Sequence, residues 1–291
     1  PTYNRKLKLK HAINSILNQT YKRWELIIID NNSHDGTDEL ISNLKNPQIK
    51  LITINNNGII AKSRNKGIKS SKGEYIAFLD SDDWWVPEKL QSCVELINSS
   101  NRSVDLIYHS LYVSKSRSQS WSLRKIFARQ LKTPIFDDLI KNGNPIATSS
   151  VLLSSEIIDD VGYFSEDKNL IAAEDYDYWL RISKVTNNFF AISKPLGHWF
   201  HGENTSSPEL SLNYLKTLEE KYLITDVNNN LTKKPIWWLY QKGRSLYLKK
   251  DWSNSKIYLK QVFLSSSSVM LKLKSIFMLT KMFLIDKYEY N

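Results

Sequence analysis

The first hundred residues alternate between short apolar runs and segments of helical periodicity, and this alternation constrains the fold more than any other feature. Residues 25–30 (ELIIID), 49–54 (IKLITI) and 74–80 (EYIAFLD) have the length and β-branched content of buried strands. Apolar residues recur at helical spacing in residues 9–17 and 36–45. Near-continuous apolar strands alternating with helices are typical of a parallel α/β sheet that is covered on both faces. We therefore predict an α/β fold with a central, mostly parallel sheet.

Acidic residues stand where two of these predicted strands end. Asp30 closes the first run and Asp80 closes the third, where Asp82 and Asp83 follow within three positions. Ligands of open α/β sheets bind beyond the carboxyl ends of the strands, so both places should face one crevice. Carboxylates at this spacing repel one another unless a cation or strong hydrogen bonds lie between them.

The acidic turn at residues 80–83 suits a metal ion better than a glycine-rich phosphate loop. Neither GxxxxGK[ST] nor GxGxxG occurs in the sequence. Asp-x-Asp at a strand end suits a hard divalent cation, Mg²⁺ or Mn²⁺, that bridges protein carboxylates to substrate phosphates. The alternative is that these residues form a turn and cap the helix expected after Pro87. Trp84 and Trp85 next to the turn fit either a sugar pocket or helix packing.

Charge and cysteine usage exclude several classes of protein. The net charge of +10 is concentrated at the C-terminus, because residues 210–291 hold 14 Lys and Arg against 6 Asp and Glu. This distribution does not indicate a nucleic-acid partner. The single cysteine, Cys93, excludes internal disulfides and favours a reducing compartment, so we expect a cytoplasmic protein. No apolar run approaches the roughly 18 residues that a membrane span needs.

The composition changes near residue 206, where Lys, Tyr, Leu and Trp begin to recur at helical period. We predict a first domain over residues 1–206 and an all-helical C-terminal module over residues 207–291. Residues 269–285 combine apolar positions with lysines. This pattern suits peripheral contact with anionic lipid at the inner face of the membrane. A lid that packs on the first domain would show the same pattern.

Six motifs occur in order along residues 1–206: PTYN, LNQTY, IIIDNNSHDGT, AKSRNKGI, GEYIAFLDSDDWW and AEDYDYWLR. In this order and spacing they resemble the inverting glycosyltransferases of family 2, which have the GT-A nucleotide-sugar-binding fold. The family has a strand of about five or six apolar residues immediately before the proline that corresponds to Pro1. The resemblance therefore implies a missing first strand, and we expect a chain without it to be poorly stable.

The resemblance implies a nucleotide-sugar site at the ends of the first two segments. The PTYN motif places Thr2 and Tyr3 at the nucleotide base, and the pair after the next strand, usually Asp-Asp, is Asp30 and Asn31 here. The Asn31 oxygen can accept a hydrogen bond from a base but carries no charge, which leaves the identity of the nucleotide open. Arg64, in SRNKG, resembles an arginine that contacts the diphosphate or the base.

The resemblance also implies the metal ligands and the catalytic base. Asp80 resembles a ribose-side or metal-associated carboxylate, Asp82 the direct metal ligand, and His201 a histidine that contacts the metal or the diphosphate. An ordinary loop position explains His201 equally well. Asp175 resembles the catalytic base, with Glu174 as a neighbour that contacts the acceptor. Acids at the start of a helix are also favoured by its dipole alone.

These observations lead to one main functional prediction and two alternatives. We predict an inverting, divalent-metal-dependent glycosyltransferase that moves a sugar from a nucleoside-diphosphate donor to a hydroxyl of a polysaccharide or of a lipid-linked glycan acceptor. One base without a second nucleophile implies a single displacement. The same fold can instead serve as a non-catalytic nucleotide-sugar or glycan-binding module. A membrane-surface interaction protein that uses the helical C-terminus is the third interpretation.

Overall fold

The computed structural model describes residues 1–116, 118, 122–202, 207–223, 234–265 and 269–289. The chain forms two compact units. The first unit comprises residues 1–136, 144–166 and 174–204, and the second comprises residues 137–143, 167–173 and 205–291.

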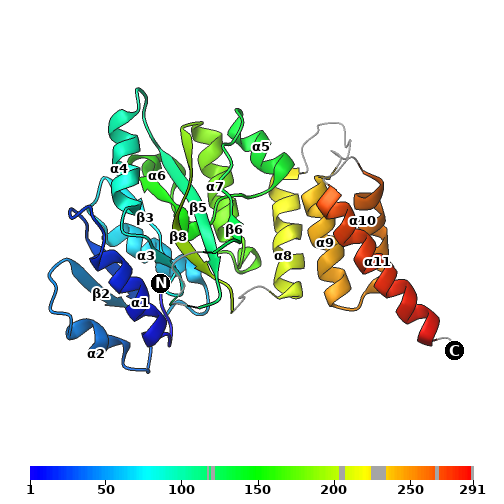
Figure 1. The fold of residues 1–291 in the computed structure, drawn as a ribbon, viewed down its shortest axis with the longest axis horizontal. Coiled ribbons are helices and arrows are strands. Elements are labelled where there is room, and N and C mark those ends of the chain that lie inside the picture. Colours follow the sequence, from blue (N-terminus) through cyan, green and yellow to red (C-terminus); the bar gives the residue numbers. More distant parts are fainter. Residues whose placement is uncertain (117, 119–121, 203–206, 224–233, 266–268, 290–291) are drawn as a thin grey trace. The chain divides into compact units, whose positions relative to one another are not determined.

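The N-terminal part of the first unit is a small parallel sheet covered by helices (Figure 1). β1 (Leu26–Asp30) pairs in parallel with β2 (Ile49–Thr53). One apolar cluster joins β1 to helices α1 (Lys6–Leu17) and α2 (Thr37–Ser42). The expected strand and helix positions of this region are confirmed, because β-branched runs bury well between helices.

The larger sheet of the first unit is mixed. It has the order β3-β7-β5-β8-β4, with β6 paired to β5. Its strands are β3 (Tyr75–Ala77), β4 (Trp84–Trp85), β5 (Leu106–Ser114), β6 (Lys125–Ile126), β7 (Leu152–Ser154) and β8 (Phe189–Phe200). Only β5 and β8 pair in parallel among these strands, and the other pairs are antiparallel. The α/β class is confirmed, but the strand directions are more mixed than expected, because the acidic turn folds the chain back so that β4 runs against β8.

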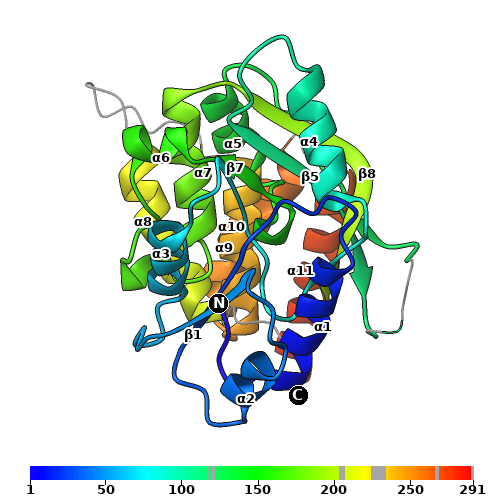
Figure 2. The same ribbon diagram turned by 90° about the vertical axis from the view of Figure 1, so that its left-hand side faces the viewer.

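Helices flank this sheet, as Figures 1 and 2 show from two directions. They are α3 (Ile60–Ser70), α4 (Lys89–Ser99), α6 (Glu156–Val161) and α7 (Glu174–Val185), with a short 3₁₀ turn η1 (Thr148–Ser150). Helix α5 (Ile135–Asn142) starts at the end of a first-unit segment and continues into the second unit, to which the 3₁₀ turn η2 (Lys168–Leu170) also belongs. Cys93 of α4 is fully buried with Ile107 of β5 and Leu152 of β7. Cys93 is thus a small apolar core residue.

An apolar groove of about 840 Å³ separates β1 from β3. Its lining includes Ile27 and Ile29 of β1 and Ile76 of β3. In the described part of the chain, β3 pairs with β7, and β1 pairs with β2 and forms one bridge to Thr2. The further strand that the resemblance implies, and the low stability expected without it, stay predictions.

The second unit is built from helices α8 (Pro208–Leu218), α9 (Ile236–Leu248), α10 (Trp252–Leu264) and α11 (Val269–Glu289), with a π-helical turn η3 (Glu219–Leu223) after α8. Gly243 lets α9 and α10 approach closely, because a Cβ there would lie 2.9 Å from Leu259. The Trp237 indole donates a hydrogen bond to the Ile140 carbonyl (2.8 Å), which explains why the end of α5 belongs to this unit. The predicted helical character is confirmed, and the boundary near residue 206 stays a prediction.

None of the helices that the structure describes is both long enough and apolar enough to cross a membrane.

Candidate active site

The acidic turn after β3 is fixed by hydrogen bonds to two neighbouring segments. The main-chain N–H of Asp80 donates to the Ser149 hydroxyl (3.1 Å), and Asp83 accepts a bond from the Phe200 N–H at the end of β8 (2.9 Å). Burial, followed by the charge of Asp80, raises the pKa of Asp83 well above its ordinary value. Asp83 therefore orients the turn, and its neighbours Asp80 and Asp82 extend from a rigid support.

Arg64 of α3 joins the turn to the first residue of α7. Its Nη2 donates to Asp80 Oδ1 at 2.9 Å, and its Nη1 donates to Glu174 Oε1 at 2.6 Å. The Arg64 side chain is only 4% exposed and that of Glu174 is 9% exposed. Burial raises the pKa of Asp80, but the surrounding positive charges, that of Arg64 first, together with the hydrogen bond from Arg64 hold this pKa below its ordinary value. Asp80 is therefore an ionised carboxylate with a fixed counter-ion.

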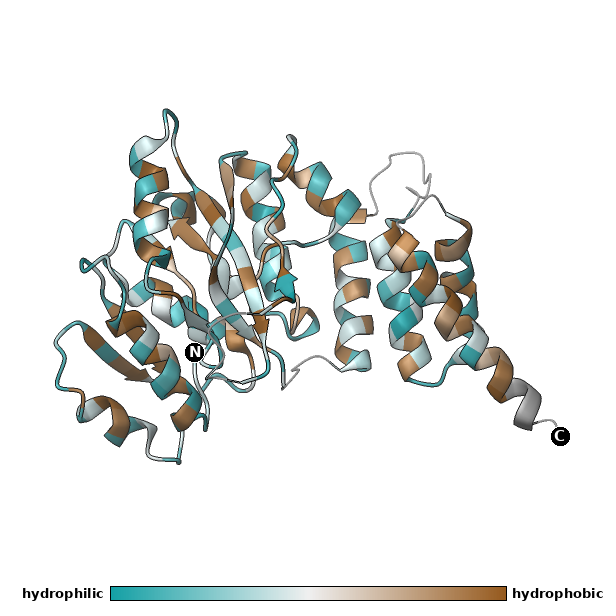
Figure 3. Cartoon of the chain, in the orientation of Figure 1, coloured by the Kyte–Doolittle hydropathy of each residue, from teal (hydrophilic) through white to brown (hydrophobic). Residues whose placement is uncertain are grey.

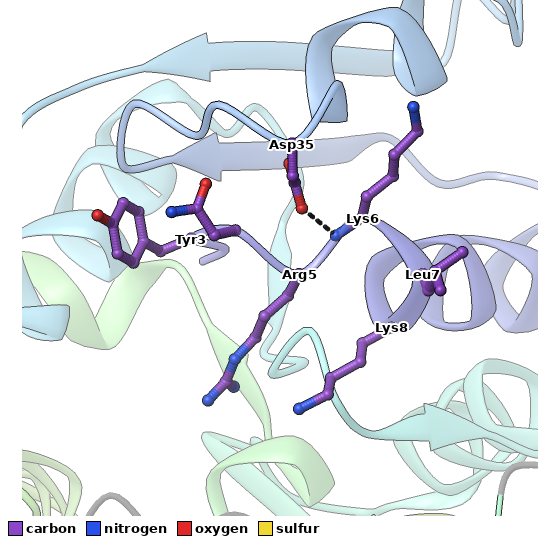
Figure 4. Close-up of a pocket in the computed structure, with 7 residues that line it drawn as sticks. Tyr3, Arg5, Lys6, Leu7, Lys8 and Asp35 are labelled. Atoms are coloured by element: carbon purple, nitrogen blue, oxygen red, sulfur yellow. Dashed lines mark hydrogen bonds between the residues drawn. The ribbon is translucent and has the colours of Figure 1, made fainter.

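Asp82 faces the other way and pairs with Arg5 at 2.9 Å. Burial, followed by the charge of Asp80, raises the pKa of Asp82, and Arg5 opposes this effect. Arg5 belongs to a pocket of about 480 Å³ that is lined by residues 3–8 and Asp35. Figure 4 shows Arg5 and Lys8 extending to the same side of this segment, while Asp35 accepts a hydrogen bond from the Lys6 N–H (2.7 Å). Asp82 thus lies beside a cationic segment.

Asp175 lies in the first turn of α7. Its Oδ2 accepts a hydrogen bond from the Thr148 hydroxyl (3.1 Å), and its Oδ1 accepts one from the Tyr176 N–H (2.7 Å). Burial, followed by the neighbouring charge of Glu174, raises the pKa of Asp175 to about 7, against the lowering effect of Arg64. A carboxylate with a pKa near neutrality is suited to general-base chemistry. Glu174 also has a buried oxygen, Oε2, without a hydrogen-bond partner in the described part of the chain.

The four residues expected at the nucleotide base come together at the end of β1. The Thr2 N–H donates to the Ile29 carbonyl, and the Asn31 N–H donates to the Thr2 carbonyl (both 2.9 Å). Asp30 is buried and accepts hydrogen bonds from the N–H and hydroxyl of Ser33. Asn31 Oδ1 accepts a bond from the Asn56 N–H (2.7 Å). The Tyr3 ring is half exposed and points away from Arg5 (Figure 4).

The expected metal ligands are only partly brought together. Over the residues that the structure describes, no group of three or more His, Cys, Asp and Glu side chains is arranged to hold a metal ion. His201 follows the Phe200 N–H that bonds Asp83, and its Nδ1 is buried without a hydrogen-bond partner in the described residues. Asp80 and Asp82 are neighbouring carboxylates of the kind that suit a hard divalent cation with substrate oxygens as further ligands, and His201 does not form a three-residue set with them in the described part of the chain.

The tryptophans beside the turn are packing residues. Trp84 is 7% exposed, stacks on His198 with ring centroids 4.7 Å apart and meets His11 edge to face. Trp85 is 6% exposed and donates from its indole to the Ser149 carbonyl (2.8 Å). Of the two interpretations left open by the sequence, burial supports packing. Arg5, Thr148 and Ser149 were not predicted from the sequence, although Arg5 directly follows the PTYN motif.

Comparisons with known proteins agree with this geometry. The family model described as "Glycosyl transferase family 2" matches residues 1–158. A curated relative from Escherichia coli is named UDP-Glc:alpha-D-GlcNAc-diphosphoundecaprenol beta-1,3-glucosyltransferase WfgD. It is 29% identical over 240 residues, which are 82% of this chain and 87% of the relative.

Two solved structures share the fold at low sequence identity. The crystal structure of S. aureus TarS residues 1–349 in complex with UDP-GlcNAc is 18% identical with a TM-score of 0.63, and the match covers 90% of this chain and 79% of TarS. The mannosyltransferase PcManGT from Pyrobaculum calidifontis, in complex with GDP-Man and Mn²⁺, is 14% identical with a TM-score of 0.56, and the match covers 98% of this chain and 78% of PcManGT. The expected GT-A fold is confirmed.

Proposed function

This chain belongs to glycosyl transferase family 2, and we propose that it catalyses the inverting, divalent-metal-dependent transfer of a sugar from a nucleoside-diphosphate donor to a hydroxyl of a lipid-linked or polysaccharide acceptor. The observation that carries this proposal is the arrangement of Asp175 and Glu174 at the start of α7, next to Arg64 and the acidic turn. A candidate base that one buried arginine holds next to a charged turn fits an enzyme of group transfer better than a non-catalytic binding module.

Asp175 is the proposed general base. A sugar hydroxyl becomes a good nucleophile only as its proton is removed, and a positioned carboxylate contributes roughly 10² to 10⁴ in rate by taking it. The hydroxyl of Thr148 and the N–H of Tyr176 fix the orientation of the Asp175 carboxylate. The unpartnered Glu174 Oε2 supplies a buried acceptor that can bind a hydroxyl of the incoming sugar. Attack assisted by one base inverts the anomeric centre.

The donor nucleotide is proposed to bind at the ends of β1 and β3. Thr2, Tyr3, Asp30 and Asn31 would surround the base, with Asp80 on the ribose or metal side. Asp82, with Asp80 and His201, would hold Mg²⁺ or Mn²⁺. A divalent ion there supplies Lewis-acid stabilisation of the charge that develops on the departing diphosphate, worth several kcal/mol. The curated relative carries UDP-Glc in its name and one structural neighbour binds UDP-GlcNAc, which supports a uridine nucleotide.

A lipid-linked acceptor at the cytoplasmic membrane surface is favoured by the second unit. The curated relative is named for a diphosphoundecaprenol-linked acceptor. Residues 236–285 hold nine Lys and Arg and a single acidic residue, Asp251. Apolar side chains of α11 are exposed, including Val269 at 73% and Phe283 at 66%. The hydropathy colouring shows hydrophobic residues along much of this helix (Figure 3). Such a surface suits peripheral contact with anionic lipid.

The test of catalysis is Asp175→Asn with UDP-sugars, Mn²⁺ and a GlcNAc-diphosphate-lipid acceptor. We expect transfer to fall by roughly 10² to 10⁴, the contribution of a positioned base, while calorimetry shows unchanged donor binding. Asp159→Asn, an exposed carboxylate of α6, is the matched control and should keep full activity. Donor binding without transfer by the unaltered protein would instead support the non-catalytic binding module.

The test of membrane contact is sedimentation with vesicles that contain phosphatidylglycerol. Changing Leu273 and Phe277 of α11 together to Ser should release the protein, since both side chains are exposed. Leu123→Ser is the control, because Leu123 is 89% exposed on the first unit. Unchanged sedimentation of the α11 variant would refute the contact.

A further inference from the structure

Arg64 has an arrangement that differs from that of a ligand-binding arginine. Its two terminal nitrogens point in two directions within the protein, to Asp80 after β3 and to Glu174 at the start of α7. Its guanidinium also lies over the Phe164 ring, 5.6 Å from the centroid. The side chain is 4% exposed. The planar fork is therefore directed at protein carboxylates and covered by protein atoms.

The ion pairs of Arg64 with Asp80 and Glu174 connect the two parts of the proposed site whose relative position the reaction depends on, the donor-binding turn and the base. Asp80 belongs to the turn proposed to hold the donor, and Glu174 precedes the proposed base. Arg64 and Glu174 are 110 positions apart in the chain, and Arg64 and Asp80 are 16 apart. A guanidinium presents donors in a rigid planar fork, so it fixes the separation of two carboxylates in a way that a flexible ammonium does not.

We propose that Arg64 is a positioning residue that locks the donor-binding turn to the first turn of α7 and thereby sets the orientation and charge of Asp175. This inference rests on the proposed function of Asp175 as the base. It differs from the expectation, drawn from the family resemblance, that Arg64 contacts the diphosphate or the base of the nucleotide.

The charges that face Asp175 give the proposal a measurable consequence. They are Glu174 on α7 and Arg64 on α3, and the uncharged hydroxyl of Thr148 in η1 also contacts the carboxylate. Burial and Glu174 raise the pKa of Asp175 to about 7, and Arg64 lowers it. Without Arg64, the carboxylate should hold its proton to higher pH. Because the base must be ionised to act, activity at neutral pH should then be lost and return as the pH rises.

The experiment compares pH profiles of kcat/KM for the unaltered protein, Arg64→Gln and Arg64→Lys. The unaltered protein should lose activity as pH falls through about 7, the pKa of Asp175. For Arg64→Gln we expect this acidic limb of the pH profile to move to higher pH. A rise of one unit in the pKa of Asp175 would lower its ionised fraction at pH 7 from about a half to about a tenth, which is about a fivefold loss of activity. Arg64→Lys keeps the positive charge but loses the planar guanidinium. Its acidic limb should therefore stay near that of the unaltered protein, while its kcat should fall.

The matched control is Arg181→Lys. Arg181 lies on α7, the helix that begins with Glu174 and Asp175, and it also makes several contacts, to Asp177 and to the carbonyls of Val161 and Tyr163. Arg181→Lys should leave the acidic limb of the kcat/KM pH profile where it is in the unaltered protein. Affinity for UDP in the presence of Mn²⁺, measured by calorimetry, should be little changed in both Arg64 variants. Weaker UDP binding in the Arg64 variants, together with an unchanged acidic limb of the pH profile, would overturn the proposal and would show that Arg64 contacts the nucleotide.

A second readout does not depend on transfer. Carbon NMR of the protein with ¹³C-labelled aspartate follows the Asp175 carboxyl directly, and Asp175→Asn identifies its signal. The pKa should be higher in Arg64→Gln than in the unaltered protein and in Arg64→Lys. An equal pKa of Asp175 in all three proteins would contradict the positioning role of Arg64, whether or not sugar transfer is found. A higher pKa of Asp175 in Arg64→Gln, without sugar transfer by the unaltered protein, would support the positioning role and refute only the proposed function.

Discussion

The two arginines on either side of the acidic turn differ in how they are held. Arg64 has a side chain that is 4% exposed and joins two carboxylates, Asp80 and Glu174. Arg5 has a side chain that is 27% exposed and pairs with Asp82 at 2.9 Å. Both guanidiniums neutralise the same crowded turn, but one is enclosed by protein and the other borders an open pocket.

This difference separates a fixed part of the site from an exchangeable part. Removing one member of a buried ion pair leaves an uncompensated charge away from water, which is strongly destabilising. A pair near solvent contributes little, and its members can be rehydrated or take another partner. In the proposed mechanism, Asp82 is therefore the carboxylate that exchanges Arg5 for a divalent cation, whereas Asp80 keeps its ion pair with Arg64.

The largest expected effect comes from removing the exchangeable carboxylate. Asp82→Asn should lower metal-dependent transfer by roughly 10³, because Lewis-acid stabilisation is worth several kcal/mol and 1.4 kcal/mol corresponds to a factor of about ten. The measurement is release of nucleoside diphosphate during a Mn²⁺ titration. Full activity of Asp82→Asn at every Mn²⁺ concentration would mean that Asp82 does not hold the cation.

A direct comparison of the two arginines uses the free energy of unfolding. Arg64→Met should cost roughly 3–5 kcal/mol, as expected when one partner of a buried pair is removed. Arg5→Met should cost about 0–1 kcal/mol, as for ion pairs near the surface. Urea unfolding followed by circular dichroism gives both values. Equal costs would erase the distinction between a fixed and an exchangeable pair.

The smallest expected effect concerns metal affinity. Arg5→Gln removes the cation that occupies Asp82, so Mn²⁺ should bind up to about fivefold more tightly in the absence of donor, which corresponds to roughly 1 kcal/mol. Electron paramagnetic resonance of free Mn²⁺ measures this change without any turnover. Arg102→Gln, on the connection between α4 and β5, serves as the control. Weaker binding in Arg5→Gln would show that Arg5 does not compete for Asp82.

Much of the fold was accessible from the sequence because burial leaves a periodic pattern. The runs at residues 25–30 and 49–54 contain β1 and β2, and the acidic turn follows β3 as expected. Strand direction was less accessible, because an apolar run shows that a strand is buried but not which neighbour pairs with it. The short strands β4 and β7 therefore altered the expected sheet.

The site was predictable as a set of residues but not as a network. Asp80 and Asp82 stand out because they follow an apolar run directly, and Glu174 and Asp175 were noticed through a motif that resembles family 2. The partners of these acids are determined by contacts between distant segments, such as the 77 positions that separate Arg5 from Asp82. Arg64 was noticed through its motif, but no local pattern indicated that it bridges two carboxylates.

The most direct test of the central claim is anomalous diffraction from crystals soaked with Mn²⁺ and UDP-GlcNAc. The account predicts a manganese peak at the Asp82 carboxylate, in contact with the diphosphate, with Arg5 displaced from Asp82 and Arg64 still joined to Asp80 and Glu174. A bound nucleotide without a peak at Asp82, and with Arg5 still paired to that carboxylate, would contradict it.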